Sequence, residues 1–185
     1  MTKKERAKAR KTYDERNYEL MVSLWKEELE SIPRWNRKEN DGFTTIPRWL
    51  PIINRIMDKL SQGKPISSTY LSLWFRVNDE GFIHIKDEKQ MAIESGFDSE
   101  RNISTWKTRM RELEKFGFIN SITGVKGEFQ YVLIVNPLNV IENLDNIAEY
   151  SSLPKSIKEI ISQYKINFIN YNTKKLLMVK ITNRS

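Results

Sequence analysis

The segment from Asp87 to Val135 constrains the fold of this chain most, because helix, turn and strand signals follow one another in it without interruption. Residues 87–95 have an acidic first turn and apolar side chains at Met91 and Ala92. They end at Gly96, which can take the left-handed conformation that often terminates a helix. A second apolar pattern at helical spacing follows, formed by Ile103, Trp106, Met110, Leu113 and Gly117. This spacing predicts a long helix with one buried face.

Residues after this helix have the composition of two short strands. Residues 118–122 and 129–135 are rich in apolar and β-branched side chains, and residues 123–128 between them contain two glycines. Glycines between two strand-forming runs favour a hairpin. Residues 82–86 also alternate, and we expect them to add a third strand beside the hairpin. The chain is therefore predicted to be mainly α with a small antiparallel β-sheet, an α+β fold.

Seven residues of this segment resemble the pattern shared by bacterial winged helix-turn-helix DNA-binding domains. They are Ala92, Gly96, Trp106, Met110, Leu113, Gly117 and Ile119. In that pattern an Ala-x-x-x-Gly turn precedes a recognition helix that ends in Gly-x-Ile. The resemblance covers roughly a quarter of the chain. It implies a winged-helix core with N- and C-terminal helical extensions, whose recognition helix enters the major groove of duplex DNA.

The side of this helix opposite the apolar pattern is rich in cationic, amide and hydroxyl side chains, which reach phosphates and base edges. On the resemblance, Lys126 at the hairpin tip would meet the adjacent backbone or minor groove. The arginines and Lys107 are expected to supply affinity, and the amide and hydroxyl groups to read bases. The predicted DNA contacts are Arg101, Asn102, Thr105, Lys107, Thr108, Arg109, Arg111, Lys115 and Lys126.

The composition limits the partners and the chemistry of the chain. A formal charge of +7 and a pI near 9.5 favour a polyanionic partner, nucleic acid or an acidic membrane surface. No run of apolar residues is long enough to span a membrane, and the N-terminus lacks a signal-peptide pattern, so we expect a soluble, cytoplasmic protein. The absence of cysteine excludes disulfides, thiolate zinc sites and cysteine nucleophiles.

The search for catalytic residues in the sequence finds little. The single histidine, His84, lies in a predicted strand with no second histidine or cysteine to share a metal ion. None of the seven glycines belongs to a phosphate-binding loop. The paired acids Asp79-Glu80 and Asp87-Glu88 fit a turn and a helix first turn. We therefore expect no enzyme activity, no catalytic residue, no metal site and no cofactor.

Three parts of the chain are predicted: residues 1–41, a winged-helix domain over 42–144, and an extension over 145–185. The first part joins a basic arm, expected to be disordered when free, to an amphipathic helix. Two apolar patterns outside the domain are candidates for a homodimer contact, unless one of them caps the core of a single chain. The N-terminal pattern is Tyr18, Met21, Leu24, Trp25 and Leu29. The C-terminal pattern is Ile157, Ile160, Ile161, Tyr164 and Phe168.

Two functions follow from these observations. The first is a non-enzymatic double-stranded DNA-binding protein, either a transcription regulator or a replication or maintenance protein of a plasmid or phage. The lack of an obvious ligand-sensing segment favours the second role. The alternative is a protein-protein interaction module built on the same fold. Its binding would be nearly insensitive to salt and would depend on Trp25, Trp35 or the terminal apolar patterns.

Overall fold

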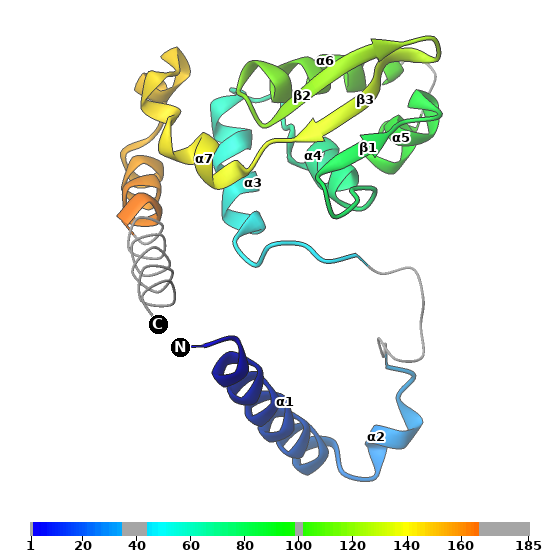
Figure 1. Ribbon diagram of the computed structural model, residues 1–185, viewed down its shortest axis with the longest axis vertical. Coiled ribbons are helices and arrows are strands. Elements are labelled where there is room, and N and C mark those ends of the chain that lie inside the picture. Colours follow the sequence, from blue (N-terminus) through cyan, green and yellow to red (C-terminus); the bar gives the residue numbers. More distant parts are fainter. Residues whose placement is uncertain (1, 35–43, 99–101, 167–185) are drawn as a thin grey trace, which may run out of the picture. The chain divides into compact units, whose positions relative to one another are not determined.

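The computed structural model describes residues 2–34, 44–98 and 102–166 (Figure 1). The chain divides into two compact units, Met1–Phe43 and Thr44–Ser185. The larger unit is mainly helical with one three-stranded antiparallel sheet, as the sequence predicted. Its elements in chain order are α3 (Leu50–Leu60), α4 (Ser67–Trp74), β1 (Phe82–His84), α5 (Glu88–Glu94), α6 (Ile103–Lys115), β2 (Ile119–Gly124), β3 (Gly127–Ile134) and α7 (Pro137–Glu142).

The smaller unit consists of α1 (Lys3–Trp25) and α2 (Glu28–Ser31). The Thr2 hydroxyl accepts a hydrogen bond from the Glu5 backbone N–H, and the Glu5 carboxylate accepts one from the Thr2 backbone N–H. This capping box starts a helix that contains no glycine or proline. The prediction of a disordered basic arm is therefore wrong, because residues 3–11 form the first half of α1.

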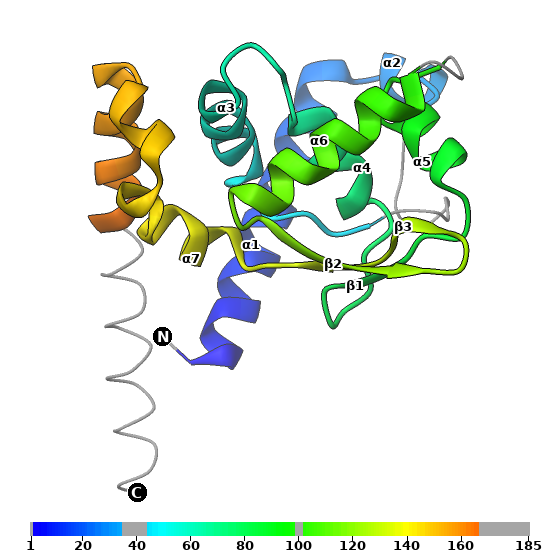
Figure 2. The same cartoon turned by 90° about the horizontal axis from the view of Figure 1, so that it is seen from above.

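One hydrophobic core holds the larger unit together. Its centre is formed by side chains with no exposed surface on α3, α4 and α6, including Ile56, Leu73 and Trp106. Figure 2 shows α4, α5 and α6 on one side of the sheet. Ile83 of β1 and Val132 of β3 point to this side and close the core from below the helices. The sheet is therefore covered by helices on one face.

The start of α4 is fixed by a residue on another helix. The Asp58 carboxylate on α3 accepts hydrogen bonds of 2.9 Å from the backbone N–H groups of Ile66 and Ser67. It also accepts one of 2.6 Å from the Ser67 hydroxyl. A helix N-terminus has free N–H groups, and here Asp58 satisfies them in place of a local capping side chain. The contact therefore joins α3 to the start of α4.

Two glycines terminate helices as the sequence predicted. Gly96 after α5 and Gly117 after α6 have φ angles of +89° and +78°, which only glycine adopts without strain. In each case the next backbone N–H bonds back into the helix, from Phe97 to Ala92 and from Phe118 to Leu113, both at 2.9 Å. The start of α6 agrees with the start of its apolar pattern. The helix begins at Ile103, and its N-cap residue is Asn102, whose side chain makes no capping bond.

The sheet has the strand order β1-β3-β2, so the predicted third strand lies beside the hairpin. The hairpin loop is shorter than predicted. Strand pairing continues to Gly124 and Gly127, past a bulge, so that Val125 and Lys126 form the tip. The glycines allow this, because a Cβ on Gly124 would lie 2.0 Å from the Gln130 side chain. Gly124 therefore leaves room for the Gln130 side chain, and Gly127 leaves room for the Glu88 side chain.

The C-terminal apolar pattern is buried in the core of the larger unit. After α7, two short 3₁₀ helices, Leu144–Asn146 and Ala148–Ser152, lead to helical residues 155–166. Ile157 and Ile161 of that helix are 1% and 0% exposed and belong to the same core as α3 and α6. Ile160 packs beside them, and Phe168 lies outside the described residues. This pattern therefore covers the core of its own chain.

Candidate nucleic-acid interface

One side of the helix α6 is buried in the core, and the opposite side faces solvent. Trp106, Met110 and Leu113 have no exposed surface, and the Trp106 ring packs edge-on against Phe129 of β3, with centroids 5.8 Å apart. An α-helix has 3.6 residues per turn, so residues 104, 108, 111 and 115, which are spaced four, three and four apart, lie together on the opposite side. We call this side the open face of α6. It consists of Ser104, Thr108, Arg111 and Lys115.

The other predicted contact residues lie around this face. Thr105 and Arg109 are half-buried on one flank, and Lys107 is half-buried on the other. Arg101 lies outside the described residues, and Asn102 is the N-cap residue of α6. The Nε atom of Arg109 is buried and has no hydrogen-bond partner among the described residues. The structure therefore places Arg111, Thr108 and Lys115 better for a contact with a large ligand than Thr105 or Arg109.

Lys126 lies at the tip of the hairpin, which is held in a fixed shape. The buried side-chain oxygen of Gln130 accepts a hydrogen bond of 3.0 Å from the Lys126 backbone N–H. The Gln130 amide in turn donates to His84 Nε2 at 3.2 Å, and the His84 ring stacks on Tyr131. His84 therefore contacts both Tyr131 in the sheet and the Gln130 side chain that binds the hairpin tip. The exposed Lys126 side chain extends from this tip.

Three cations of α6 form ion pairs within the protein. Lys107 Nζ lies 2.7 Å from the Glu88 carboxylate of α5. The Arg111 guanidinium donates two hydrogen bonds, of 2.8 and 2.7 Å, to the Glu128 carboxylate of β3. Lys115 pairs with Glu149, which follows α7 in the second 3₁₀ helix. The sequence analysis identified the three cations but none of these partners, because the three glutamates come from elements far apart in the sequence.

These ion pairs differ in how firmly they are held. The Glu88 side chain is 12% exposed and also accepts a hydrogen bond of 2.9 Å from the Phe129 backbone N–H, so it joins α5, α6 and β3. The Arg111 side chain, in contrast, is 55% exposed and its Glu128 partner 35%. Exposed ion pairs contribute only about 0–1 kcal/mol. A phosphate group can therefore compete with Glu128 for Arg111, whereas Lys107 is held by a Glu88 carboxylate that joins three elements of the fold.

The charges of the exposed pairs also affect one another's protonation. The hydrogen bonds that Arg111 donates to Glu128 raise the pKa of Arg111, and the one that Lys115 donates to Glu149 raises the pKa of Lys115. The Lys115 ammonium lowers the pKa of the Glu149 carboxyl. Both cations of the open face therefore hold their protons more firmly than they would without these partners.

The positive charge of the chain is unevenly distributed. Residues 44–166 contain 16 Lys and Arg against 15 Asp and Glu, whereas residues 167–185 contain four Lys and Arg and no acidic residue. The formal charge of +7 therefore does not come from the part of the larger unit that carries α6. Any attraction of a polyanion to this part depends on where individual cations lie, and not on its total charge.

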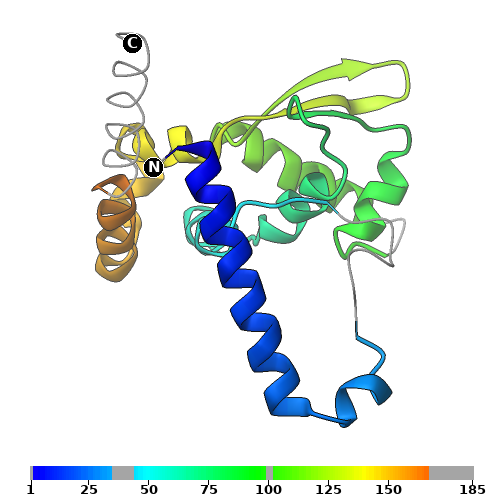
Figure 3. The ribbon, with the colours of Figure 1, turned by 60° about the horizontal axis from the view of Figure 1, so that its bottom comes forward.

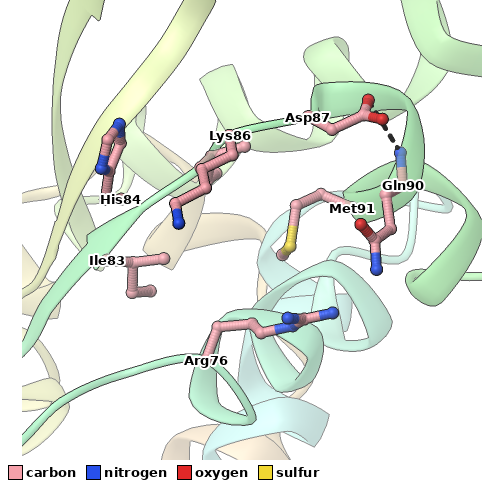
Figure 4. Close-up of a pocket in the computed structure, with 8 residues that line it drawn as sticks. Arg76, Ile83, His84, Lys86, Asp87, Gln90 and Met91 are labelled. Carbon is pink, nitrogen blue, oxygen red and sulfur yellow. Dashed lines mark hydrogen bonds between the residues drawn. The ribbon is translucent and has the colours of Figure 1, made fainter.

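A pocket of about 260 Å³ lies between β1 and α5 (Figure 4). Arg76 donates hydrogen bonds to the Glu94 carboxylate, and Asp87 caps α5 by accepting from the backbone N–H groups of Lys89 and Gln90. These charged groups are already used in holding the fold, so we assign no reaction to the pocket. Its lining consists of Arg76, Ile83, His84, Ile85, Lys86, Asp87, Gln90 and Met91.

The face of the sheet that the helices leave uncovered is largely apolar. Phe82 and Leu133 are paired across β1 and β3, and Ile122 of β2 is paired with Tyr131 of β3. Ile122 is 65% exposed and Leu133 48%. The Phe82 and Tyr131 rings stack, with centroids 6.4 Å apart. This face is suited to contact with another apolar surface more than with phosphates.

Within residues 2–34, 44–98 and 102–166, no three His, Asp or Glu side chains gather closely enough to hold a metal ion. In the same part of the chain, no helix has the length and apolar composition needed to cross a membrane. The comparisons with known proteins give no assignment. No protein-family model, no curated protein and no solved structure matches this chain.

Proposed function

We propose that this protein is a non-enzymatic, winged helix-turn-helix protein that binds duplex DNA. The order of elements from α4 to β3 supports this: helix, strand, helix, helix and a two-stranded hairpin, with β1 added beside β3. A winged-helix domain has this order, with two consecutive helices before the hairpin. The second of these two helices enters the major groove. In this chain that helix is α6.

The open face of α6 is the observation that carries the proposal. It places the hydroxyls of Ser104 and Thr108 beside the cations of Arg111 and Lys115, along a helix whose opposite side is fully buried. Cations bind phosphates and hydroxyls bond to base edges or phosphates. An α-helix fits the major groove, and the hairpin tip with Lys126 would then meet the neighbouring backbone.

The proposed mechanism includes an exchange of partners at Arg111. In the free protein its guanidinium binds the Glu128 carboxylate through two hydrogen bonds. A DNA phosphate offers the same planar guanidinium two acceptor oxygens and a full negative charge. Binding would replace a weak exposed ion pair by contacts to a polyanion that releases condensed counterions. Glu128 would then oppose binding, because its carboxylate faces the phosphates.

Fluorescence anisotropy of labelled duplexes tests the proposal. Random-sequence fragments and fragments of the source genome are titrated with the full chain at two salt concentrations, near 50 and 200 mM as used for such proteins. We expect salt-dependent binding to both, with tighter binding to a subset of the genomic fragments. Equal binding to every fragment would reduce the proposal to non-specific attraction, and no binding at the lower salt concentration would overturn it.

Within this function, two roles use such a surface: transcription regulation, and replication or maintenance of a plasmid or phage. The genomic fragments in the same titration separate them. A tight site upstream of an open reading frame supports a regulator. Repeated tight sites within a replication origin support a replication or maintenance protein.

A protein-protein interaction module is the second candidate function, and the uncovered face of the sheet favours it. Ile122, Leu133 and Phe82 expose apolar surface there without a cation among them. Binding of a protein through this face would be nearly insensitive to salt, since apolar burial does not depend on counterion release. Ile122→Gln together with Leu133→Gln should abolish such binding and leave the affinity for DNA unchanged, because the substitutions add no charge.

A further inference from the structure

The start of α1 concentrates positive charge. Residues 3–11 contain six Lys and Arg against one acid, Glu5, which gives a formal charge of +5. Residues 44–166 contain 16 Lys and Arg against 15 acids, which gives a charge of only +1. Figure 3 shows that residues 3–11 belong to one continuous helix with the rest of α1. A stronger attraction for polyanions is therefore expected at the smaller unit than at residues 44–166.

Three lysines of this segment form a line along one side of α1. Lys4, Lys8 and Lys11 are four and three residues apart, and this spacing places side chains on the same face of a helix. We call this line the basic ridge. All three residues are exposed, and the ridge extends over about 10 Å of the helix axis. Three cations are therefore presented to solvent in a row.

The carboxylates of the smaller unit leave the basic ridge accessible. Lys11 Nζ lies 3.8 Å from the Glu15 carboxylate, and the two side chains are 80% and 59% exposed. An ion pair as exposed as this one contributes little, so a phosphate can compete for Lys11. Among the described residues, Lys4 and Lys8 have no carboxylate partner. The ridge can therefore accept an external anion without the loss of a strong contact.

The arrangement of these cations opposes the stability of the free helix. Lys4 and Lys8 are four residues apart and Lys8 and Lys11 three, and like charges at these spacings destabilise a helix. Lys4 also lies in the first turn of α1, where the helix dipole disfavours a cation. The Glu5 carboxylate is the one acid of the segment, and it accepts the capping hydrogen bond from the Thr2 backbone N–H. An anion bound along the ridge would remove both unfavourable effects.

The surroundings of the basic ridge favour the phosphate backbone of a duplex as its occupant. Ala7 and Ala9 are the only apolar side chains in residues 3–12. A helix that lies on a membrane inserts large apolar side chains, and a protein interface has an apolar centre. The larger apolar side chains of residues 18–25 surround the helix and form no apolar face beside the ridge. Duplex DNA needs no such face, because it carries one negative charge per about 1.7 Å of its axis.

We propose that the basic ridge of α1 binds the phosphate backbone of duplex DNA, as a contact separate from the open face of α6. This inference rests on the proposed function, which supplies the duplex as the partner. Contacts to phosphates carry no sequence information, so the ridge adds the same affinity for every sequence. That affinity falls as salt rises, because it depends on the release of condensed counterions. Preference among sequences stays with α6 and the hairpin.

The ridge variant combines Lys4→Gln, Lys8→Gln and Lys11→Gln in the full chain. Glutamine removes the charge and has nearly the helix propensity of lysine, so the variant should keep the circular dichroism signal of α1. In the anisotropy titrations we expect its affinity to fall about tenfold or more, and the slope of log affinity against log salt to fall by about two to three units. The loss should be the same for random and genomic duplexes, because phosphates are common to both.

A matched control removes the same charge from exposed lysines that lie on neither α1 nor α6. It combines Lys59→Gln, Lys64→Gln and Lys155→Gln. We expect this variant to bind duplexes much more tightly than the ridge variant, although the two have equal net charge. Equal affinities and equal salt slopes for the two variants would overturn the proposal, because only the total charge would then matter.

Chemical modification of lysine locates the contact without any substitution. The unmodified chain is treated briefly with an amine-specific acetylating reagent, with and without a random-sequence duplex at low salt, and mass spectrometry measures the acetylation of each lysine. The duplex should slow the reaction of the three ridge lysines several-fold. Lys64 and Lys155 should react equally in both samples. Unchanged reactivity of the ridge lysines in the presence of bound duplex would overturn the proposal.

Two further measurements separate this inference from its alternatives. If the ridge variant loses affinity and Arg111→Ala does not, the ridge contact stands and the contact through α6 falls, whereas the opposite result overturns the ridge alone. No binding of duplex by the unmodified chain would overturn both. Vesicles of equal parts phosphatidylserine and phosphatidylcholine replace the duplex in the last titration. If the ridge variant loses binding to these vesicles but keeps its affinity for DNA, the ridge serves a membrane surface and the proposal is wrong.

Discussion

Arg111 on α6 and Glu128 on β3 are joined by two parallel hydrogen bonds, of 2.8 and 2.7 Å, across the gap between the helix and the hairpin. The pair is half-exposed and links the two elements that the proposed function assigns to DNA. The pair therefore links the stability of the free protein to the proposed binding of DNA. The Glu128 carboxylate holds Arg111 in place in the free protein, and a DNA phosphate must displace it.

Glu128→Gln should strengthen binding to duplex DNA. The change removes one negative charge from the proposed interface and frees the Arg111 guanidinium for phosphate. We expect the dissociation constant to fall about three- to tenfold, the equivalent of about 0.7–1.4 kcal/mol, in anisotropy titrations at low salt. Glu159→Gln on helical residues 155–166 changes the net charge equally and serves as the control. A Glu128→Gln variant that binds no better than Glu159→Gln would exclude the exchange at Arg111.

Arg111→Ala should weaken binding about tenfold, the size of one charge-assisted hydrogen bond, and lower the slope of log affinity against log salt by about one unit. Lys126→Ala removes the same charge from the hairpin tip and should cost less, since a lysine there is a single flexible contact. If both variants keep the slope and the affinity of the unmodified chain, the open face of α6 is not the DNA contact.

Gly127→Ala should destabilise the larger unit by about 1–2 kcal/mol. A Cβ at this position would lie 2.3 Å from the Glu88 carboxylate, which is held by Lys107 and by the Phe129 backbone N–H. The carboxylate must move and lose these contacts. Urea unfolding followed by circular dichroism measures the change. In a Glu88→Ala background the same substitution should cost much less, and an equal cost in both backgrounds would mean that the contact is not responsible.

Asp58→Ala should cost about 1–2 kcal/mol, because it leaves two backbone N–H groups at the start of α4 without their acceptor. The midpoint of urea unfolding should fall while the dependence of the free energy on urea stays the same. Asp79→Ala removes a carboxylate from an exposed turn and is the matched control. Equal midpoints for the two variants would show that α4 does not depend on the cap from α3.

Glu94→Gln should remove part of the pH dependence of stability. Hydrogen bonds from Arg76 lower the pKa of the Glu94 carboxyl below its ordinary value, so the folded protein binds this proton less readily than the unfolded chain. The contribution, about 0.2–1 kcal/mol for an exposed pair, is present above the unfolded pKa near 4.3 and disappears as the pH falls through the lower folded pKa. The free energies of unfolding of the two proteins should therefore differ at pH 7 and converge as the pH falls below both pKa values of Glu94. A constant difference across this range would contradict the assignment.

The sequence predicted the local features of the fold because they depend on neighbouring residues. Gly96 and Gly117 mark helix ends in the sequence, and both take the left-handed conformation there. The spacing of Trp106, Met110 and Leu113 identified the buried side of α6. Burial of one face needs only the period of the helix and a core to pack on, so such patterns can be read without coordinates.

Two expectations from the sequence failed. Residues 3–11 were expected to be disordered from their charge, but the capping box at Thr2 and the unbroken helix-forming run place them in α1. The hairpin loop was expected to include residues 123–128, whereas strand pairing continues to Gly124 and Gly127. The cap of α4 could not be read from neighbouring residues, because a carboxylate on α3 supplies it.

By itself, the sequence determined which residues of α6 are buried, where glycine ends α5 and α6, and which strands form the hairpin, because these properties follow from side-chain periodicity and backbone freedom. The tertiary structure alone decided that Lys107, Arg111 and Lys115 meet Glu88, Glu128 and Glu149, and that the C-terminal helix is buried while α1 is exposed. Ion pairs and shared cores join residues far apart in the chain, so they exist only once packing has brought the elements together.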